Sequence, residues 1–278
     1  MASTLYIVAT PIGNLEDITY RAVRILQQVD LIAAEDTRHT LQLLRALDIQ
    51  KPLLSLHEHN EQSRVEEIYR RLQEGQDIAL VSDAGTPCIS DPGAKLIQAL
   101  REKKCTITPI PGPSAVITAL SATGFTQGGF SFLGFLPVKG KERKQLLMNI
   151  AQRSQTIVLY ESPHKLIKTL QDLCDACQNP RIVVARELTK IYEEFLVDDI
   201  KNLILHFEKI PPKGEFVLIM PPDEKKEEQV TSTQEIIAFL ESCKAQGIRH
   251  KQAAEQCALQ MGISKKKAYE IGLDVFHR

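Results

Sequence analysis

The chain has 278 residues, of which 43% are hydrophobic and 25% charged, and its formal net charge is −1. This composition is typical of a globular protein, and its length favours more than one domain because single cores stop growing at roughly 250–300 residues. The near-neutral balance gives no general reason to expect nucleic-acid binding, so such contacts must come from local basic patches. No segment approaches the roughly 20 apolar residues of a membrane span, and the start does not resemble a signal peptide. We therefore expect a cytoplasmic protein whose six cysteines are reduced thiols.

The first half of the chain alternates short apolar runs with segments of helical periodicity. The apolar runs, expected to be strands, are residues 5–9, 31–34, 52–56, 78–81 and 106–110. The segments with helical periodicity are residues 20–28, 41–47, 64–73, 94–103 and 115–122. This rhythm indicates crossover connections and a mostly parallel sheet covered on both faces.

The second half has a different pattern, which begins after the glycine-rich residues 124–129. Strands are expected at 130–136, 156–160, 182–186, 194–197 and 216–220, and helices at 141–152, 164–177 and 200–209. The closer spacing of the strands favours a mixed sheet. A charged stretch then leads into a tail with two or three short helices. We expect an N-terminal α/β domain with the ligand loops at 1–128, a second α/β domain that closes the cleft at 129–222, and a linker with a helical module at 223–278.

Unusual loops follow all five predicted strands of the first half. They are rich in glycine, proline, small and acidic residues, and comprise residues 10–14, 35–38, 57–61, 82–93 and 111–115. In an open α/β sheet, ligands bind beyond the carboxyl ends of the strands, where such loops lie. Glycine permits close backbone approach and proline stiffens a turn. The sequence therefore predicts a binding rim built from several loops.

The rim is acidic rather than basic. Neither a GxGxxG nor a GxxxxGK[ST] motif is present, so the main sequence evidence for a dinucleotide-binding loop or a P-loop is lacking. The acidic side chains are Glu35, Asp36, Glu58, Asp83 and Asp91. Carboxylates beside main-chain donors suit a nucleoside with a positive centre, such as the sulfonium and amino groups of S-adenosylmethionine. The alternative, that these residues cap helices, stays open.

Several long motifs run through the whole α/β part of the chain. They are LYIVATPIGNLEDIT at 5–19, AEDTRHT at 34–40, SLHEHNE at 55–61, VSDAGTPCISDPG at 81–93, PGPSA at 111–115, FLGFLPVKGKERK at 132–144, YESPHKL at 160–166 and ARELTKIYEE at 185–194. With these motifs the chain resembles the small-subunit (16S) ribosomal RNA cytidine 2′-O-methyltransferases, a branch of the tetrapyrrole-methylase superfamily. The resemblance extends from residue 5 to about residue 222 and is expected to continue into the tail.

The resemblance implies a class III methyltransferase fold with S-adenosylmethionine in a cleft between two α/β domains. It also implies a homodimer and, as acceptor, a cytidine of 16S ribosomal RNA, free or in the small ribosomal subunit. Carried over position by position, the cofactor contacts of the first domain are Pro11, Asp83, Gly85, Ser114 and Ala115. Those of the second domain are Leu136, Tyr160, Leu188 and Gly214.

A ribose hydroxyl is a poor nucleophile, so a general base would speed the transfer. The candidates are Glu35, Asp36, His57, Glu58, Glu161 and Glu187. We favour Glu161 because it ends a second-domain strand and should face the cleft; capping of the next helix together with Ser162 is the alternative. Arg38 either orients the acidic rim or meets RNA phosphate, and an ion pair with Asp36 or Glu35 is equally compatible. The predicted catalytic set is thus Glu161, Glu35 and Arg38, with no metal.

Basic residues cluster between the first strand and first helix of the second domain. These residues, Lys139, Lys141, Arg143 and Lys144, are the predicted RNA contacts, because phosphate binding is chiefly cationic. A solvated helix start is the alternative. The tail carries a second basic group and is interpreted as an auxiliary ribosome-binding module or a dimer contact. Two other functions stay open: methylation of a small tetrapyrrole-like acceptor, and a non-catalytic S-adenosylmethionine-binding role in ribosome assembly.

Overall fold

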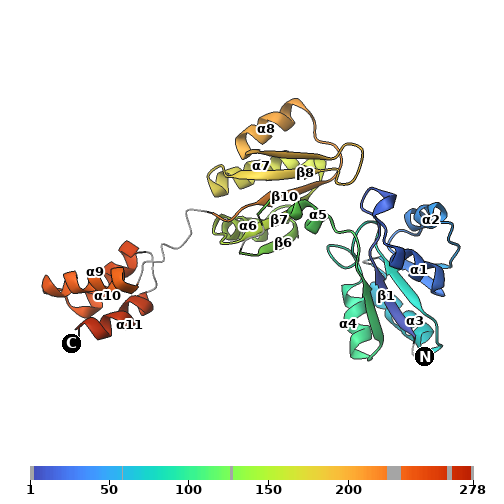
Figure 1. The fold of residues 1–278 in the computed structure, drawn as a ribbon, viewed down its shortest axis with the longest axis horizontal. Helices are drawn as coiled ribbons and strands as arrows, with labels where there is room; N and C mark the ends of the chain where they lie inside the picture. Colours follow the sequence, from blue (N-terminus) through green and yellow to red (C-terminus); the bar gives the residue numbers. More distant parts are fainter. Residues whose placement is uncertain (1–2, 58, 126–127, 224–232, 262–264, 277–278) are drawn as a thin grey trace. The chain divides into compact units, whose positions relative to one another are not determined.

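A computed structural model describes residues 3–57, 59–125, 128–223, 233–261 and 265–276 (Figure 1). The chain forms two compact units: residues 1–150 with 156–221, and residues 151–155 with 222–278. Within the described residues, no helix is both long enough and apolar enough to cross a membrane.

The first unit contains the predicted parallel sheet. Its strands are β1 (Thr4–Val8), β2 (Leu31–Ala34), β3 (Leu53–Ser55), β4 (Ile78–Val81) and β5 (Thr106–Ile110). They lie in the order β3-β2-β4-β1-β5, and every pairing is parallel, which confirms the prediction. Side chains alternate between two cores, so that Leu5 and Leu80 belong to one core and Val8 and Val81 to the other. The sheet is therefore buried on both faces.

Four helices cover this sheet: α1 (Tyr20–Gln28), α2 (Thr37–Ala46), α3 (Glu61–Gln73) and α4 (Ala94–Glu102). A single 3₁₀ turn, η1 (Leu15–Asp17), precedes α1. Buried residues of α1 and α2 join the core of Val8, whereas those of α3 and α4 join the core of Leu5. α2 begins four residues earlier than predicted because the Asp36 carboxylate accepts a hydrogen bond from the backbone nitrogen of Arg38 and caps the helix.

The second sheet is mixed, as predicted. Its strands are β6 (Phe130–Phe135), β7 (Thr156–Glu161), β8 (Arg181–Arg186), β9 (Glu194–Asp199) and β10 (Phe216–Met220), in the order β6-β7-β10-β8-β9. Only β6 and β7 pair in parallel; the other pairings are antiparallel. One face packs against α6 (Lys141–Ala151), α7 (Pro163–Cys177) and α8 (Ile200–Lys209). Leu170 of α7 and Phe207 of α8 are buried in that core.

The other face of the second sheet is covered by α5 (Ala115–Ser121), which precedes the predicted domain boundary at residue 128. Val116, Ala119 and Leu120 of α5 are buried against side chains of the second sheet, among them Val158 and Val217. A helix expected to belong with the first sheet thus completes the core of the second. Both α/β halves accordingly fall into one compact unit.

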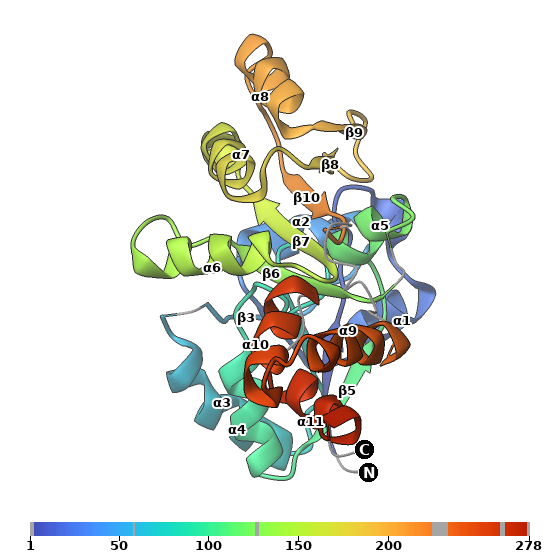
Figure 2. The ribbon, with the colours of Figure 1, turned by 90° about the vertical axis from the view of Figure 1, so that its left-hand side faces the viewer.

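The described residues of the tail form three helices around a small core of their own (Figure 2). They are α9 (Thr233–Ala245), α10 (His250–Met261) and α11 (Lys265–Phe276). The His250 ring stacks on Tyr269, with the ring centroids 4.1 Å apart, and on Phe276. The sequence also predicts that Gly262 ends one helix of the tail and that Ser264 is the N-cap of the next, and both positions lie outside the described residues.

Candidate active site

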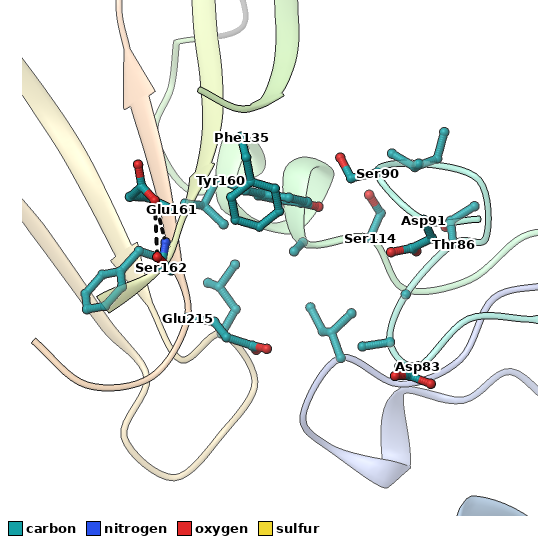
Figure 3. Close-up of a pocket in the computed structure, with 18 of the residues that line it drawn as sticks. Asp83, Thr86, Ser90, Asp91, Ser114, Phe135, Tyr160, Glu161, Ser162 and Glu215 are labelled. Carbon is teal, nitrogen blue, oxygen red and sulfur yellow. Dashed lines mark hydrogen bonds between the residues drawn. The ribbon is translucent and has the colours of Figure 1, made fainter. Parts of the chain in front are cut away.

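A cavity of about 450 Å³ lies within the first unit. Its volume falls in the range of roughly 300–1,000 Å³ that small-molecule sites occupy. One side is formed by loops at the carboxyl ends of the parallel sheet and the other by residues of the second sheet (Figure 3). The strand order explains which loops take part. β1, β4, β5 and β2 are neighbours, and their loops all reach the cavity. The described residues of the loop after edge strand β3, 57 and 59–61, do not line it, and Glu58 lies outside the described residues.

Backbone hydrogen bonds tie the loops of the rim together. The nitrogen of Thr10 donates to the oxygen of Gly85 at 2.9 Å, and the nitrogen of Gly85 donates back to Thr10 at 3.1 Å. The hydroxyl of Thr86 donates to the oxygen of Pro113 at 3.1 Å. Gly85 has a φ of +78°, a conformation that favours glycine, and a Cβ at this position would lie 3.2 Å from Cγ2 of Ile12, so glycine lets the loops after β1 and β4 approach closely.

Most of the residues predicted to bind the cofactor line this cavity. Those lining it are Asp83, Gly85, Ser114, Ala115, Tyr160, Leu188 and Gly214. Pro11 does not line it, although its neighbour Ile12 does. Leu136 is buried in the core between the second sheet and its three helices, so the structure does not bring its side chain to the cavity.

Three carboxylates face the cavity from the first sheet. Burial, helped by the charges of Asp83 and Asp91, raises the pKa of Glu35. Burial also raises the pKa of Asp91 to about 6; a hydrogen bond with Ser82 opposes this rise and the charge of Asp83 adds to it. The Asp83 carboxylate accepts a hydrogen bond from the backbone nitrogen of Asp36 at 3.0 Å. The site therefore concentrates negative charge where water is partly excluded.

Aromatic side chains form part of the opposite wall. The ring of Tyr160 meets those of Phe132 and Phe135 edge to face, with centroids 4.8 Å and 5.7 Å away. Burial, reinforced by the charge of Asp91, raises the pKa of Tyr160 to about 12, so its hydroxyl remains protonated. Phe135 stays 54% exposed although it borders the cavity.

Glu161 borders the cavity, but its carboxylate is turned away from the side that carries Asp83 and Asp91 (Figure 3). One oxygen accepts from the backbone nitrogen of Ser162 at 2.8 Å, and the other accepts from the hydroxyl of Thr169 at 2.6 Å. The residue is only 3% exposed. Both carboxylate oxygens of Glu161 are thus paired at the start of α7. The capping alternative is not observed as stated, because the side chain of Ser162 accepts no cap hydrogen bond. The role of Glu161 as a general base stays a prediction.

The other two members of the predicted catalytic set differ from each other. Glu35 lines the cavity, whereas Arg38 does not and its side chain is 89% exposed. The guanidinium of Arg38 pairs with the carboxylate of Asp36 at 2.9 Å and, as donor, lowers the pKa of that group to about 2. The ion-pair alternative for Arg38 is thus the one observed.

The predicted RNA contacts also separate into two kinds. Lys139, Lys141 and Lys144 are exposed at the start of α6. Arg143 is buried, and its guanidinium donates to the oxygen of Pro137 at 2.9 Å, the hydroxyl of Thr169 at 3.0 Å and the carboxylate of Asp172 at 2.8 Å. Its prediction as an RNA contact is wrong in this structure, because the charge lies inside the fold and is already paired.

Several lining residues were not predicted from the sequence, notably Phe135 and Glu215, whereas Ser90 belongs to the predicted rim loop at 82–93. Phe135 follows Gly134, and a glycine inside a strand pattern signals a bulge that can redirect the next side chain. Glu215 follows Gly214, and its carboxylate pairs with Lys190 at 3.0 Å. No comparable signal marks Glu215, because the ion pair joins residues far apart in the sequence.

Comparison with known proteins identifies the family. A model of the tetrapyrrole (corrin/porphyrin) methylases matches residues 4–204. The chain belongs to this family. A relative of this methylase from Synechocystis sp. is 45% identical over 98% of both chains, and one from Pasteurella multocida is 44% identical over 100% of this chain and 99% of its own. Both relatives are named ribosomal RNA small subunit methyltransferase I.

Solved structures show that this fold serves different methylases. A cobalt precorrin-4 methyltransferase is 21% identical with a TM-score of 0.59, over 78% of this chain and 94% of its own. A diphthine synthase is 14% identical with a TM-score of 0.63, over 79% of this chain and 90% of its own. At these identities the likeness shows the fold alone. Together with the family match, it establishes this chain as a methyltransferase of the tetrapyrrole-methylase fold.

The raised pKa of Asp91 predicts a specific dependence of stability on pH. The folded state holds the Asp91 proton more tightly than an unfolded chain, whose carboxyl has the usual pKa of 3.8, so this residue lowers stability as pH rises from 3.8 to about 6. Asparagine cannot ionise. Asp91→Asn should therefore be more stable than the wild type above pH 6, and the gain should shrink toward pH 4. Urea unfolding at a series of pH values measures this difference.

Asp175→Asn provides the control, because this carboxylate is exposed on α7 away from the cavity. Its unfolding curves should follow the wild type across the same pH range. A constant difference between Asp91→Asn and the wild type from pH 4 to pH 8 would contradict the assignment of a raised pKa to Asp91.

Proposed function

We propose that this methyltransferase transfers a methyl group from S-adenosylmethionine to the 2′-hydroxyl of a cytidine in 16S ribosomal RNA. The observation that carries the proposal is the 44–45% identity, over nearly the whole chain, to relatives named as small-subunit ribosomal RNA methyltransferases. From the resemblance described above, we also propose that the enzyme is a cytoplasmic homodimer.

The residues of the cavity fit S-adenosylmethionine. Ile12 adds apolar surface beside Gly85, and the carboxylates of Asp83 and Asp91 complement positive charge. Leu188 and Val217 add apolar surface on the opposite wall. When bound, S-adenosylmethionine supplies a methyl group that its positive sulfur already activates.

The protein then has two tasks, to align the acceptor oxygen with the methyl group and to keep water out. Such alignment can contribute roughly 7–11 kcal/mol to lowering the barrier. The rim loops are suited to it because paired backbone hydrogen bonds hold them against one another. Tyr160, with its protonated hydroxyl and its ring packed on Phe132 and Phe135, supports a fixed wall for the reactants.

We assign the general base to Asp91 rather than to Glu161. A base works best when its pKa lies near the working pH. Asp91 lines the cavity and its pKa is raised to about 6, so near neutrality it is ionised and still able to accept a proton. The 2′-hydroxyl would pass its proton to this carboxylate as the new bond between oxygen and carbon forms and the bond between that carbon and sulfur breaks, which would leave a neutral thioether.

Transfer of labelled methyl from S-adenosylmethionine tests the proposed reaction. The acceptors are small ribosomal subunits that lack the modification, stripped 16S RNA and a porphyrinogen. We expect label in subunit RNA, at one position that resists alkaline cleavage, because a 2′-O-methyl group removes the attacking hydroxyl. Label in the porphyrinogen alone would favour a small tetrapyrrole acceptor. Cofactor binding without any transfer would favour the non-catalytic role.

The pH dependence of the reaction tests the base. The wild-type kcat/KM for S-adenosylmethionine, which reports the free enzyme, should rise as pH increases through about 6, where Asp91 loses its proton. Asp91→Asn should lower kcat by roughly 10²–10⁴-fold and flatten this rise. An unchanged pH profile in the variant would show that another group takes the proton.

The exposed lysines at the start of α6 are the proposed phosphate contacts. Each phosphate contact on single-stranded nucleic acid contributes roughly 0.7 to the slope of log K against log salt. Changing Lys139, Lys141 and Lys144 to glutamine should therefore weaken RNA binding and reduce that slope by about 2 if each lysine meets one phosphate. Filter binding at several salt concentrations measures both quantities.

The matched control changes Arg21 and Arg24, which are exposed on α1, to glutamine. Cofactor affinity should stay at the wild-type value in both variants. If the lysine variant keeps the wild-type slope, the solvated-helix alternative for this segment holds instead.

A further inference from the structure

Phe135 is an exposed aromatic side chain at a catalytic cavity. It is 54% exposed, yet it borders the cavity. Its ring lies beside that of Tyr160 (Figure 3). Exposed phenylalanine is unfavourable in water, since an aromatic side chain gains more from burial than most residues. A ring held in this position therefore suggests a binding partner.

A bulge in β6 places the ring there. The pairing of β6 with β7 shifts register between Phe132 and Phe135. In a regular strand, residues three apart face opposite sides, but Phe132 and Phe135 both contact Tyr160. Gly134 makes this possible with a φ of +63°, and a Cβ at that position would lie 3.2 Å from the Ser90 hydroxyl oxygen. The bulge thus turns Phe135 from the core side of the sheet toward the cavity.

The residues that follow fix the ring in place. Leu136 is buried in the core, and the oxygen of Pro137 accepts a hydrogen bond from the buried guanidinium of Arg143 at 2.9 Å. Beyond these anchors lie the exposed lysines at 139, 141 and 144. One short segment therefore carries an aromatic face at the cavity and the proposed phosphate contacts further along the chain.

We propose that Phe135 is the platform on which the base of the acceptor nucleotide stacks. This inference rests on the proposed function, in which the ribose of one nucleotide must enter a cavity in the protein. Enzymes that act on a nucleotide within structured RNA or DNA commonly take it out of its stack, and aromatic side chains then stack with the exposed base. Stacking on Phe135 would hold the ribose while the lysines hold the neighbouring phosphates.

Substitutions that separate ring stacking from apolar bulk test this role. Phe135→Leu keeps an apolar side chain but removes the ring face, and it should raise the KM for small ribosomal subunits roughly 5- to 150-fold. Phe135→Trp retains a ring and should keep a KM close to that of the wild type. Phe130→Leu is the matched control, because Phe130 is also exposed on β6 but does not line the cavity. The control should leave KM and kcat unchanged.

The Phe135 ring has two candidate stacking partners, the base of the acceptor nucleotide and the adenine of the cofactor. The affinity for S-adenosylmethionine, measured by calorimetry for each variant, distinguishes between them. An unchanged cofactor affinity with a raised RNA KM supports stacking of the acceptor. Weaker cofactor binding in Phe135→Leu with an unchanged RNA KM would assign the ring to the cofactor and overturn the proposal. If the wild type methylates RNA and Phe135→Leu changes neither the KM for RNA nor the affinity for S-adenosylmethionine, only the stacking role is overturned. Absence of RNA methylation by the wild type would instead overturn the proposed function and this inference with it.

Discussion

The site depends on the pair of backbone hydrogen bonds that joins Thr10 to Gly85. These residues follow β1 and β4, which are neighbours at the centre of the parallel sheet. Because both bonds are between backbone atoms, they fix the course of the two loops whatever their side chains do. The loop with Ile12 and the loop with Asp83 and Asp91 can then form one continuous wall, and Thr86 connects the loop after β5 through Pro113.

Periodicity and loop composition predicted most of the fold. The strands of both sheets, the helices between them, the parallel first sheet and the mixed second sheet all agree with the sequence pattern, because alternating burial and helical spacing are local properties. The position of α5 was not predictable in this way. Its apolar residues suit either sheet, and only the three-dimensional path of the chain decides that they pack on the second.

In the candidate site, too, features that depend on local sequence were predicted, whereas features that depend on contacts between distant residues were not. Loop motifs identified residues such as Asp83, Gly85 and Ser114 as lining the ligand site, because parallel strands bring their carboxyl ends together. The pairing of Glu161 and Arg143 inside the fold was not predicted, for a different reason. Residue type and position in the sequence do not show that Thr169, on α7, accepts a hydrogen bond from Arg143 and donates one to Glu161. Two charged side chains in functional motifs therefore contribute to the interior of the fold.

The bulge in β6 has a consequence for how this family can vary over evolution. Gly134 adds one residue to a strand whose side chains otherwise alternate between two environments. If the segment became a regular extended strand at unchanged length, simple alternation would return. Leu136 and Phe135 would then exchange places, so that an aliphatic chain faced the cavity and a ring entered the core. Loss of the extra residue together with the bulge would instead leave Phe135 at the cavity and Leu136 in the core. At this strand, the backbone conformation of Gly134 and the number of residues between Phe132 and Phe135 are therefore constrained together.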